Sequence, residues 1–180
     1  MNVGAIKEEG FGYYFAWGET EPKSEYSWKA YKWCNGTSRT LTKYCTKESF
    51  GNLDRKTKLD AEDDAAYVNW GKDWRMPSEE QFKELLNSYY TNIVWTKKNG
   101  VKGLRITSKD NGKSIFLPAA AYHHDKELDA NVGYVGDYWS RTLESDDSKG
   151  AWSLGWDTGN VYLVDSSRSR GQSIRPVRNQ

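Results

Sequence analysis

The chain has 180 residues, which is enough for one domain with a substantial core. Its 26 basic and 25 acidic side chains give a formal net charge of +1 without a long run of one sign, so no nucleic-acid partner is expected. Only 37% of the residues are hydrophobic, but 9 Trp, 12 Tyr and 5 Phe bury much area per residue, which argues against an intrinsically disordered chain.

The N-terminal residues 1–5 carry no basic-then-apolar leader, and no apolar run is long enough to span a bilayer. The sequence therefore predicts either a cytoplasmic protein or a piece of a longer precursor, without direct membrane insertion of this domain. Residues 11–17 are aromatic and strand-like. The stretch 18–58 lacks periodicity and is expected to be irregular. The aromatic residues expected to hold this stretch are Trp28, Tyr31, Trp33 and Tyr44.

Two helices are predicted in the next part of the chain. Residues 60–70 suit a short helix with Asp60 as N-cap and Gly71 closing its C-terminus. A clearer helix begins at Ser78, because Ser78 and Gln81 have the spacing of a capping box. The apolar face of this second helix is expected to contain Phe82, Leu85, Leu86 and Tyr89.

After residue 91 the hydrophobic period becomes that of strands. The expected strands lie at 92–95, 101–107, 113–120, 151–156, 160–164 and 173–177. Asn99-Gly100 and Asn111-Gly112 are hairpin turn signals between the first three. The predicted fold class is α+β, with two helices in the first half and a twisted antiparallel sheet in the second.

No sequence motif indicates catalysis. The chain lacks a nucleophile elbow, a phosphate-binding loop, a dinucleotide fingerprint and a zinc-protease motif, so we expect neither enzyme activity nor a cofactor. The acidic residues 62–64 are interpreted as a favourable first turn of a helix rather than as a calcium site. No metal site is therefore expected.

The two histidines and the two cysteines are the remaining side chains that could bind a metal or react. His123 and His124 are adjacent, so on an extended chain they point to opposite sides and do not chelate one ion. They lie in the polar segment 122–135, which is expected to be a surface loop able to bind a ligand. Cys34 and Cys45 could form one disulfide or remain two thiols, and the sequence leaves both alternatives open.

The remaining chemistry lies in four segments with a mixture of Tyr, His, Trp, Asp, Ser and Arg. These segments are 122–129, 139–147, 153–158 and 162–170. Rigid aromatic side chains beside small polar ones are typical of adaptable binding surfaces. An ordinary solvated face is the alternative, and residue chemistry alone favours it.

Several longer stretches together resemble a known family. They are NVGA at 2–5, GYYFAWGETEPK at 12–23, YKWCNG at 31–36, LDAEDDAAYVNWG at 59–71, WRMPSEEQFKELL at 74–86, NGKSIFLPAAAY at 111–122, YWSRT at 138–142 and GQSIRPV at 171–177. This pattern resembles the Fibrobacter succinogenes major paralogous domain, which is abundant in Bacteroidetes surface proteins and lipoproteins. The resemblance implies a C-type lectin-like fold, related to the formylglycine-generating enzyme domain. It implies one domain over 1–180, trimmed from a longer exported protein and located at the cell surface or secreted.

The segment 138–177 also resembles the variable region of retroelement-diversified proteins, which have the same fold. In those proteins, exposed variable residues form a ligand-binding face and alternate with fixed scaffold residues, here including Tyr138, Arg168 and Pro176. With the preceding loops, the predicted ligand-binding residues are His123, His124, Trp139, Arg141, Ser153, Trp156, Asp157, Tyr162, Val164, Asp165, Ser167, Ser169 and Arg170.

Two departures from related proteins limit the functional expectation. No cysteine follows Cys45, whereas the formylglycine-generating enzymes use a late pair. Residues 21–23 and 156–158 do not match the Glu-Pro-Asn and Trp-Asn-Asp motifs of calcium-dependent lectins. We therefore predict a non-enzymatic ligand-binding domain of a bacterial surface protein, with a protein or glycan as partner. The alternative is a structural or adhesive lipoprotein or pilus-tip module without a small-molecule site.

The last twenty residues are expected to form a strand, a displayed loop and a closing strand. Val161 and Leu163 should point into the core, with Tyr162 and Val164 on the other face. The loop 165–170 should project outward. The turn back is attributed to Gly171, and the closing strand is anchored by Ile174.

Overall fold

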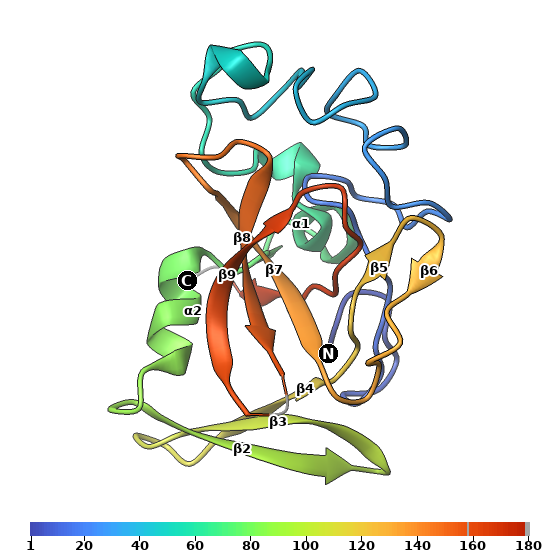
Figure 1. The fold of residues 1–180 in the computed structure, drawn as a ribbon. Helices are drawn as coiled ribbons and strands as arrows, with labels where there is room; N and C mark the ends of the chain where they lie inside the picture. Colours follow the sequence, from blue (N-terminus) through green and yellow to red (C-terminus); the bar gives the residue numbers. More distant parts are fainter. Residues whose placement is uncertain (158, 179–180) are drawn as a thin grey trace.

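The computed structural model describes residues 1–157 and 159–178, and its elements are shown in Figure 1. The helices are α1 (Ala65–Trp70) and α2 (Glu79–Leu86), with 3₁₀ turns at Glu48–Phe50 and Ala61–Asp63. The strands are β1 (Trp74–Arg75), β2 (Thr91–Lys98), β3 (Val101–Ser108), β4 (Ser114–Pro118), β5 (His123–His124), β6 (Glu127–Leu128), β7 (Gly136–Leu143), β8 (Gly150–Trp156), β9 (Val161–Ser167) and β10 (Val177–Arg178). The described residues thus form an α+β domain.

The strands form four small antiparallel sheets: β1-β10, β2-β3-β4, β5-β6 and β7-β8-β9. In Figure 1 the β7–β9 sheet stands at the centre, with β2–β4 below it and α2 at one side. One core cluster fills the space between these three parts. Its buried members include Phe82 from α2, Leu104 from β3, Leu117 from β4, and Leu154 and Trp156 from β8. These side chains recur at the helical or strand period, so each element buries one face.

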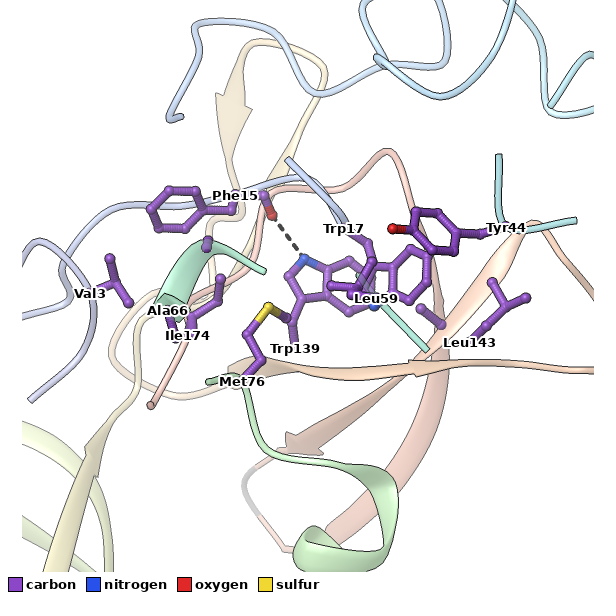
Figure 2. Close-up of a cluster of buried hydrophobic side chains, with 12 residues drawn as sticks. Val3, Phe15, Trp17, Tyr44, Leu59, Ala66, Met76, Trp139, Leu143 and Ile174 are labelled. Carbon is purple, nitrogen blue, oxygen red and sulfur yellow. Dashed lines mark hydrogen bonds between the residues drawn. The ribbon is translucent and has the colours of Figure 1, made fainter. Parts of the chain in front are cut away.

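A second core cluster surrounds two tryptophans, drawn in Figure 2. Trp139 of β7 donates its indole N–H to the carbonyl oxygen of Phe15 over 2.8 Å, and Trp17 donates its own to Ser140 over 2.9 Å. Both rings are fully buried, so these hydrogen bonds satisfy polar groups that would otherwise be costly. The segment 11–17 is therefore held by these side chains and by backbone hydrogen bonds from Tyr13, Phe15 and Trp17, although it forms no strand and makes only one isolated bridge, between Phe15 and Gln172.

Two sequence-based predictions about turns and caps are confirmed. Asn99-Gly100 joins β2 to β3 with φ values of 48° and 85°, the left-handed conformations that a tight hairpin requires. At the start of α2, Ser78 accepts a hydrogen bond from the Gln81 amide over 3.2 Å, and the Gln81 side chain accepts one from the Ser78 amide over 3.0 Å. Gly112, at φ 70°, lies in the turn between β3 and β4.

The predicted helix boundaries need two corrections. Residues 61–63 form a 3₁₀ turn, so α1 begins later and its N-cap is Asp64, not Asp60. One Asp64 oxygen accepts from the amides of Ala66 and Tyr67, and both oxygens lie 3.0 Å from the Met76 amide, which also ties α1 to β1. The helix α2 ends at Leu86, so Tyr89 lies beyond it and is 79% exposed instead of joining the apolar face.

The strand predictions are right for β2, β3, β4, β8 and β9. They are wrong for residues 11–17, which form no strand, and for the segment 122–135, which contains the hairpin β5–β6 instead of only a loop. Two further differences concern the C-terminal strand and β7. The expected strand over 173–177 reduces to β10, which pairs with β1 at the edge of the domain. In contrast, β7 was not predicted as a strand, yet it is fully integrated in the central sheet. Its pattern of buried polar and aromatic residues does not alternate.

The irregular region 18–58 is confirmed: within it the structure has only a 3₁₀ turn and isolated bridges. Tyr31 and Tyr44 are buried there, while Trp28 and Trp33 pack against core clusters from its margin. Tyr31 donates its hydroxyl proton to the carbonyl oxygen of Trp17 over 2.7 Å. Aromatic anchors therefore replace regular backbone hydrogen bonding in this part of the chain.

The expectation that residues 165–170 form an outward loop is wrong. Arg168 is fully buried, and Ser166 and Ser169 are each 5% exposed. The Arg168 guanidinium donates hydrogen bonds of 2.8–3.0 Å to the Tyr31 hydroxyl and to the carbonyl oxygens of Lys43, Tyr44 and Ser148. It also lies over the rings of Trp17, Tyr31 and Tyr44. This segment therefore fastens the irregular region to the sheet.

Of the predictions for the residues on either side of this segment, those for β9 and Ile174 are confirmed and the one for Gly171 is wrong. Val161 and Leu163 pack against the core and Tyr162 is exposed, as expected for a strand with one buried face. Ile174 is buried, which confirms its anchoring role. Gly171, however, is needed for space rather than for a turn: a Cβ there would lie 2.6 Å from the Tyr26 ring.

Candidate functional site

Four adjoining depressions lie along one side of the domain. The first, of about 370 Å³, is lined by Tyr122, His124, Glu127, Leu128, Asp129, Ala130 and Arg170. A second depression shares His124 and Glu127 with the first. A third depression shares Glu25 and Asp125 with the second. The third shares Trp28 and Ser38 with a fourth, whose lining also includes Asp147, Lys149, Asp165 and Ser167. We call these four depressions the band.

The band is assembled from four segments that are far apart in the sequence: 25–38, 122–130, 147–150 and 165–170. The β5–β6 hairpin is fixed to the irregular region because the backbones of Tyr26 and Asp125 exchange two hydrogen bonds, of 2.6 and 3.2 Å. The hairpin is also joined to the end of β9 because His123 and Gly171 exchange two more, of 2.7 and 3.0 Å. The segment 147–150 is joined to the end of β9 because the Arg168 amide donates to the Lys149 carbonyl oxygen over 3.0 Å. Backbone hydrogen bonds therefore hold all four segments of the band together.

Four of the predicted ligand-binding residues line the band: His124, Asp165, Ser167 and Arg170. Tyr162 and Val164 lie on the face of β9 opposite to Val161 and Leu163, and Asp157 is exposed at the end of β8. Thr158, which follows Asp157 in the segment 153–158, lies outside the described residues. These seven positions are compatible with contact to a ligand.

The two histidines point apart, as predicted. The His123 ring lies between two tyrosine rings, with centroid distances of 4.6 Å to Tyr14 and 5.3 Å to Tyr26. Burial lowers the pKa of His123, so it is neutral at pH 7 and acts as a packing group. His124 is exposed, and its Nδ1 lies 3.2 Å from an Asp125 carboxylate oxygen.

Four predicted ligand-binding residues are buried, and the expectation that they are displayed is wrong. Trp139 belongs to the core shown in Figure 2, and Trp156 is 1% exposed and stacks on Tyr138 at 5.5 Å. The Ser153 hydroxyl lies 3.1 Å from that of Ser166 and 3.2 Å from the Val164 carbonyl oxygen. Ser169 is 5% exposed. Strand alternation gives the reason, since Trp156 shares the inward face of β8 with Leu154.

Arg141 also has a structural rather than a displayed role. It is partly buried, and its guanidinium donates a hydrogen bond of 2.7 Å to the carbonyl oxygen of Leu59. The backbone of Leu59 in turn donates to the Arg141 carbonyl oxygen over 3.0 Å. This reciprocal contact ties β7 to the segment that precedes α1.

A group of polar residues next to the first depression contains the predicted residues Tyr162 and Arg170 together with Asp137, which the sequence did not indicate. Asp137 of β7 stands opposite Gly155 of β8, which stands opposite Tyr162 of β9, so all three lie in one row across the sheet. Their electrostatic neighbours are Tyr122, Asp129 and Arg170. We call Tyr122, Asp129, Asp137, Tyr162 and Arg170 the Asp137 cluster.

Asp137 is the most perturbed acid of this group. Burial raises the pKa of its carboxyl group to about 6, the positive charge of Arg170 opposes the rise, and the negative charge of Asp129 adds to it. The Arg170 guanidinium lies 4.7 Å from the centre of the Tyr122 ring. Asp137 could have been recognised only by placing it on a strand, where it shares a face of β7 with Trp139 and is partly buried.

One acidic group has the geometry of a cation site. Oxygen atoms of Asp60, Glu62 and Asp63 approach within 4.8 Å of one another in the described part of the chain. The Lys43 ammonium group lies 2.7 Å from Asp60 and 2.6 Å from Asp63, and the Tyr44 hydroxyl donates to Asp63 over 2.5 Å. Lys43 thus already supplies the positive charge, and the group braces the irregular region against the start of α1.

The cysteine alternatives are decided by the structure. Cys34 and Cys45 are both buried and neither forms a disulfide. The Cys34 thiol donates to the Trp28 carbonyl oxygen over 3.1 Å, and burial raises its pKa above the usual value. Burial and the raised pKa make Cys34 a poor nucleophile.

An apolar cavity of about 400 Å³ lies between α2, β4 and the C-terminal segment, on the other side of the central sheet from β5–β6 (Figure 1). Phe82, Leu85 and Leu117 contribute much of its wall. Of its polar lining residues, Gln81 is already engaged in the capping box. The band has more polar groups directed at solvent, and we therefore place the candidate site there.

None of the helices in 1–157 and 159–178 is both long and apolar enough to cross a membrane. Comparison with known proteins does not assign a family: no family model matches the chain, and no curated protein or solved structure matches it.

Proposed function

We propose that this chain is a non-enzymatic ligand-binding domain of a bacterial surface protein, and that the band with the adjoining Asp137 cluster is its binding face. One observation carries the proposal. Four adjoining depressions on one side collect aromatic, acidic, basic and hydroxyl side chains from four distant segments that backbone hydrogen bonds hold in place. Such a mixture on a rigid frame suits recognition of a polar ligand.

We further propose that the domain has the C-type lectin-like fold of the Fibrobacter succinogenes major paralogous domain. Two short helices, small antiparallel sheets and the long irregular region 18–58 support this assignment. Export to the cell surface follows from the same resemblance. Detection of an export signal or lipid-attachment cysteine upstream in the complete gene tests this part.

The proposal includes diversification of the face by a retroelement. Positions that resemble the fixed scaffold, such as Tyr138, Arg168 and Gly171, are buried, whereas Tyr162 and Asp165 in the display set are exposed. Substitution at the exposed positions would therefore cost the fold little. A search of the gene neighbourhood for a template repeat and a reverse transcriptase tests this part, and absence of both would remove it.

The binding role is tested by titrating the labelled domain with neutral, sialylated and sulfated glycans and with basic and acidic peptides. Amide shifts should map to the band, and Trp28→Ala should weaken binding because Trp28 joins two of its depressions. Tyr89→Ala is the matched control, since Tyr89 is exposed but lies beyond α2. Absence of binding to every probe would favour the structural or adhesive module instead.

A further inference from the structure

The strand β2 forms a free edge of the β2–β4 sheet. It is 8 residues long, and β3 is its only strand partner in the described part of the chain. Figure 1 shows β2 as the outermost strand at the bottom of the domain. Within 1–157 and 159–178, no isolated bridge involves residues 91–98. Such an edge leaves a row of backbone N–H and C=O groups available to another strand.

The turn at Asn99-Gly100 determines which of these backbone groups are free. In a hairpin with a two-residue turn, the residues that flank the turn exchange hydrogen bonds, and bonded and non-bonded pairs then alternate along the strands. Lys98 flanks the turn, so its backbone and that of every second residue before it bond to β3. The backbone groups of Ile93, Trp95 and Lys97 therefore point away from the sheet.

The β2 edge lacks the features that usually keep edge strands from pairing with other chains. Residues 91–98 contain no proline, and β2 and β3 keep one continuous register without a bulge over their described length. Val94 and Trp95 are 47% and 44% exposed. The charges of the strand, Lys97 and Lys98, lie together at one end. The middle of the edge is therefore apolar and uncharged.

The sequence of β2 is complementary to itself in one antiparallel register. Around a twofold axis through Val94, perpendicular to the sheet, Ile93 stands opposite Trp95 of a second copy. Both side chains lie on the face of β2 that looks toward the core, so they form two cross-strand pairs of a β-branched and an aromatic residue. Lys97 stands opposite Thr91, and no two lysines meet. A shift by one residue would put Ile93 and Trp95 on opposite faces.

We propose that the β2 edge is a homodimer interface, at which two copies of this chain pair antiparallel and join their β2–β4 sheets into one continuous sheet. The outward backbone groups gain partners, and Ile93 of each copy covers the Trp95 ring of the other. The interface leaves the band open, because β2 contributes no residue to the four depressions. A dimer therefore carries two copies of the band, which raises the apparent affinity for a ligand with repeated units.

Sedimentation equilibrium of the full chain from about 1 µM to about 1 mM tests the inference. The wild type should dimerise within this range. Val94→Lys and Trp95→Lys should each weaken the dimer about ten-fold or more, because they place like charges beside the twofold axis. Val68→Lys is the matched control and should leave the dimer unchanged, since Val68 is 46% exposed but lies on α1. Melting temperatures confirm that the three variants fold.

A cysteine at the axis tests the register. The native Cys34 and Cys45 are buried and do not compete. Position 94 stands opposite itself in a pair without hydrogen bonds, with Cα atoms about 4.5 Å apart, which a disulfide can span. Val94→Cys should therefore give a covalent dimer on mild oxidation. Lys97→Cys, in the same strand, should not, because position 97 stands opposite Thr91 and far from its own copy.

Three results would overturn the inference. A chain that stays monomeric up to about 1 mM has no such interface, and its β2 edge then serves a different partner strand or none. A dimer that survives Val94→Lys, or one that is lost in Val68→Lys, lies elsewhere on the surface. Cross-linking by Lys97→Cys but not by Val94→Cys refutes the register. The inference is independent of the proposed ligand binding, because a monomer that binds a ligand at the band removes only the dimer.

Discussion

Replacing Arg168 with alanine should cost this domain a large part of its stability. The guanidinium supplies hydrogen bonds to four oxygen atoms of the irregular region and of the segment before β8, all at 2.8–3.0 Å. Each acceptor that loses its partner in a buried site costs about 1 kcal/mol or more, so the expected loss is about 4 kcal/mol. A domain of ordinary stability has about 5–15 kcal/mol in total.

Urea unfolding of Arg168→Ala measures this loss directly. With a slope of about 2 kcal/mol per molar urea, the midpoint should fall by about 2 M. Arg170→Ala is the matched control, because Arg170 is two residues away and makes only a ring contact worth about 1 kcal/mol or less. Arg168→Lys should be intermediate, since an ammonium group cannot reach all four acceptors. Equal midpoints for the two alanine variants would refute the reasoning.

Three further predictions concern the fold. Ser78→Ala removes the capping box of α2 and should lower the free energy of unfolding by about 1 kcal/mol in urea; no change would mean that the cap is dispensable. Trp139→Phe removes one of the two hydrogen bonds to the Phe15 carbonyl oxygen, which keeps the Gln172 amide as donor, and should cost about 1 kcal/mol by the same assay, contradicted by a wild-type midpoint. A thiol reagent should modify Cys34 and Cys45 only after unfolding, and rapid labelling of the native protein would show that the thiols are accessible.

Local features of this fold were predictable from the sequence because their causes are local. The Ser78 capping box and the Asn99-Gly100 hairpin depend on residues within a few positions, and both occur as expected. The burial of Trp156 is also indicated locally. Trp156 and Leu154 are two residues apart, and a strand places such residues on the same face, here the inward one. The prediction of Trp156 as a displayed residue came from the resemblance to the variable region, not from this period.

The burial of Arg168 could not be predicted in this way. Its four acceptors belong to Tyr31, Lys43, Tyr44 and Ser148, which are 20 to 137 residues away in the sequence. No periodic pattern relates these positions, so the polar segment resembled a displayed loop. Asp137 was missed for a related reason, because its strand was not recognised and its neighbours Gly155 and Tyr162 come from other strands.

Asp137 provides a test of whether the carboxylate serves binding or folding. The pKa of an unfolded aspartate is about 3.9, whereas burial raises that of Asp137 to about 6. The native state therefore binds the proton more tightly, so this group's contribution to stability is fully present below pH 4 and is lost as the pH rises through 6. The Asp137 carboxylate thus destabilises the fold at neutral pH.

Asp137→Asn should therefore raise the free energy of unfolding at pH 8 by about 1–3 kcal/mol and have little effect at pH 4. Urea unfolding of both proteins across this range measures the difference, with Asp110→Asn as an exposed control. A variant that is more stable but no longer binds would show that the carboxylate is retained for ligand recognition at a cost to the fold. If the variant is less stable at pH 8, Asp137 is a structural residue, and its place in the proposed binding face is refuted.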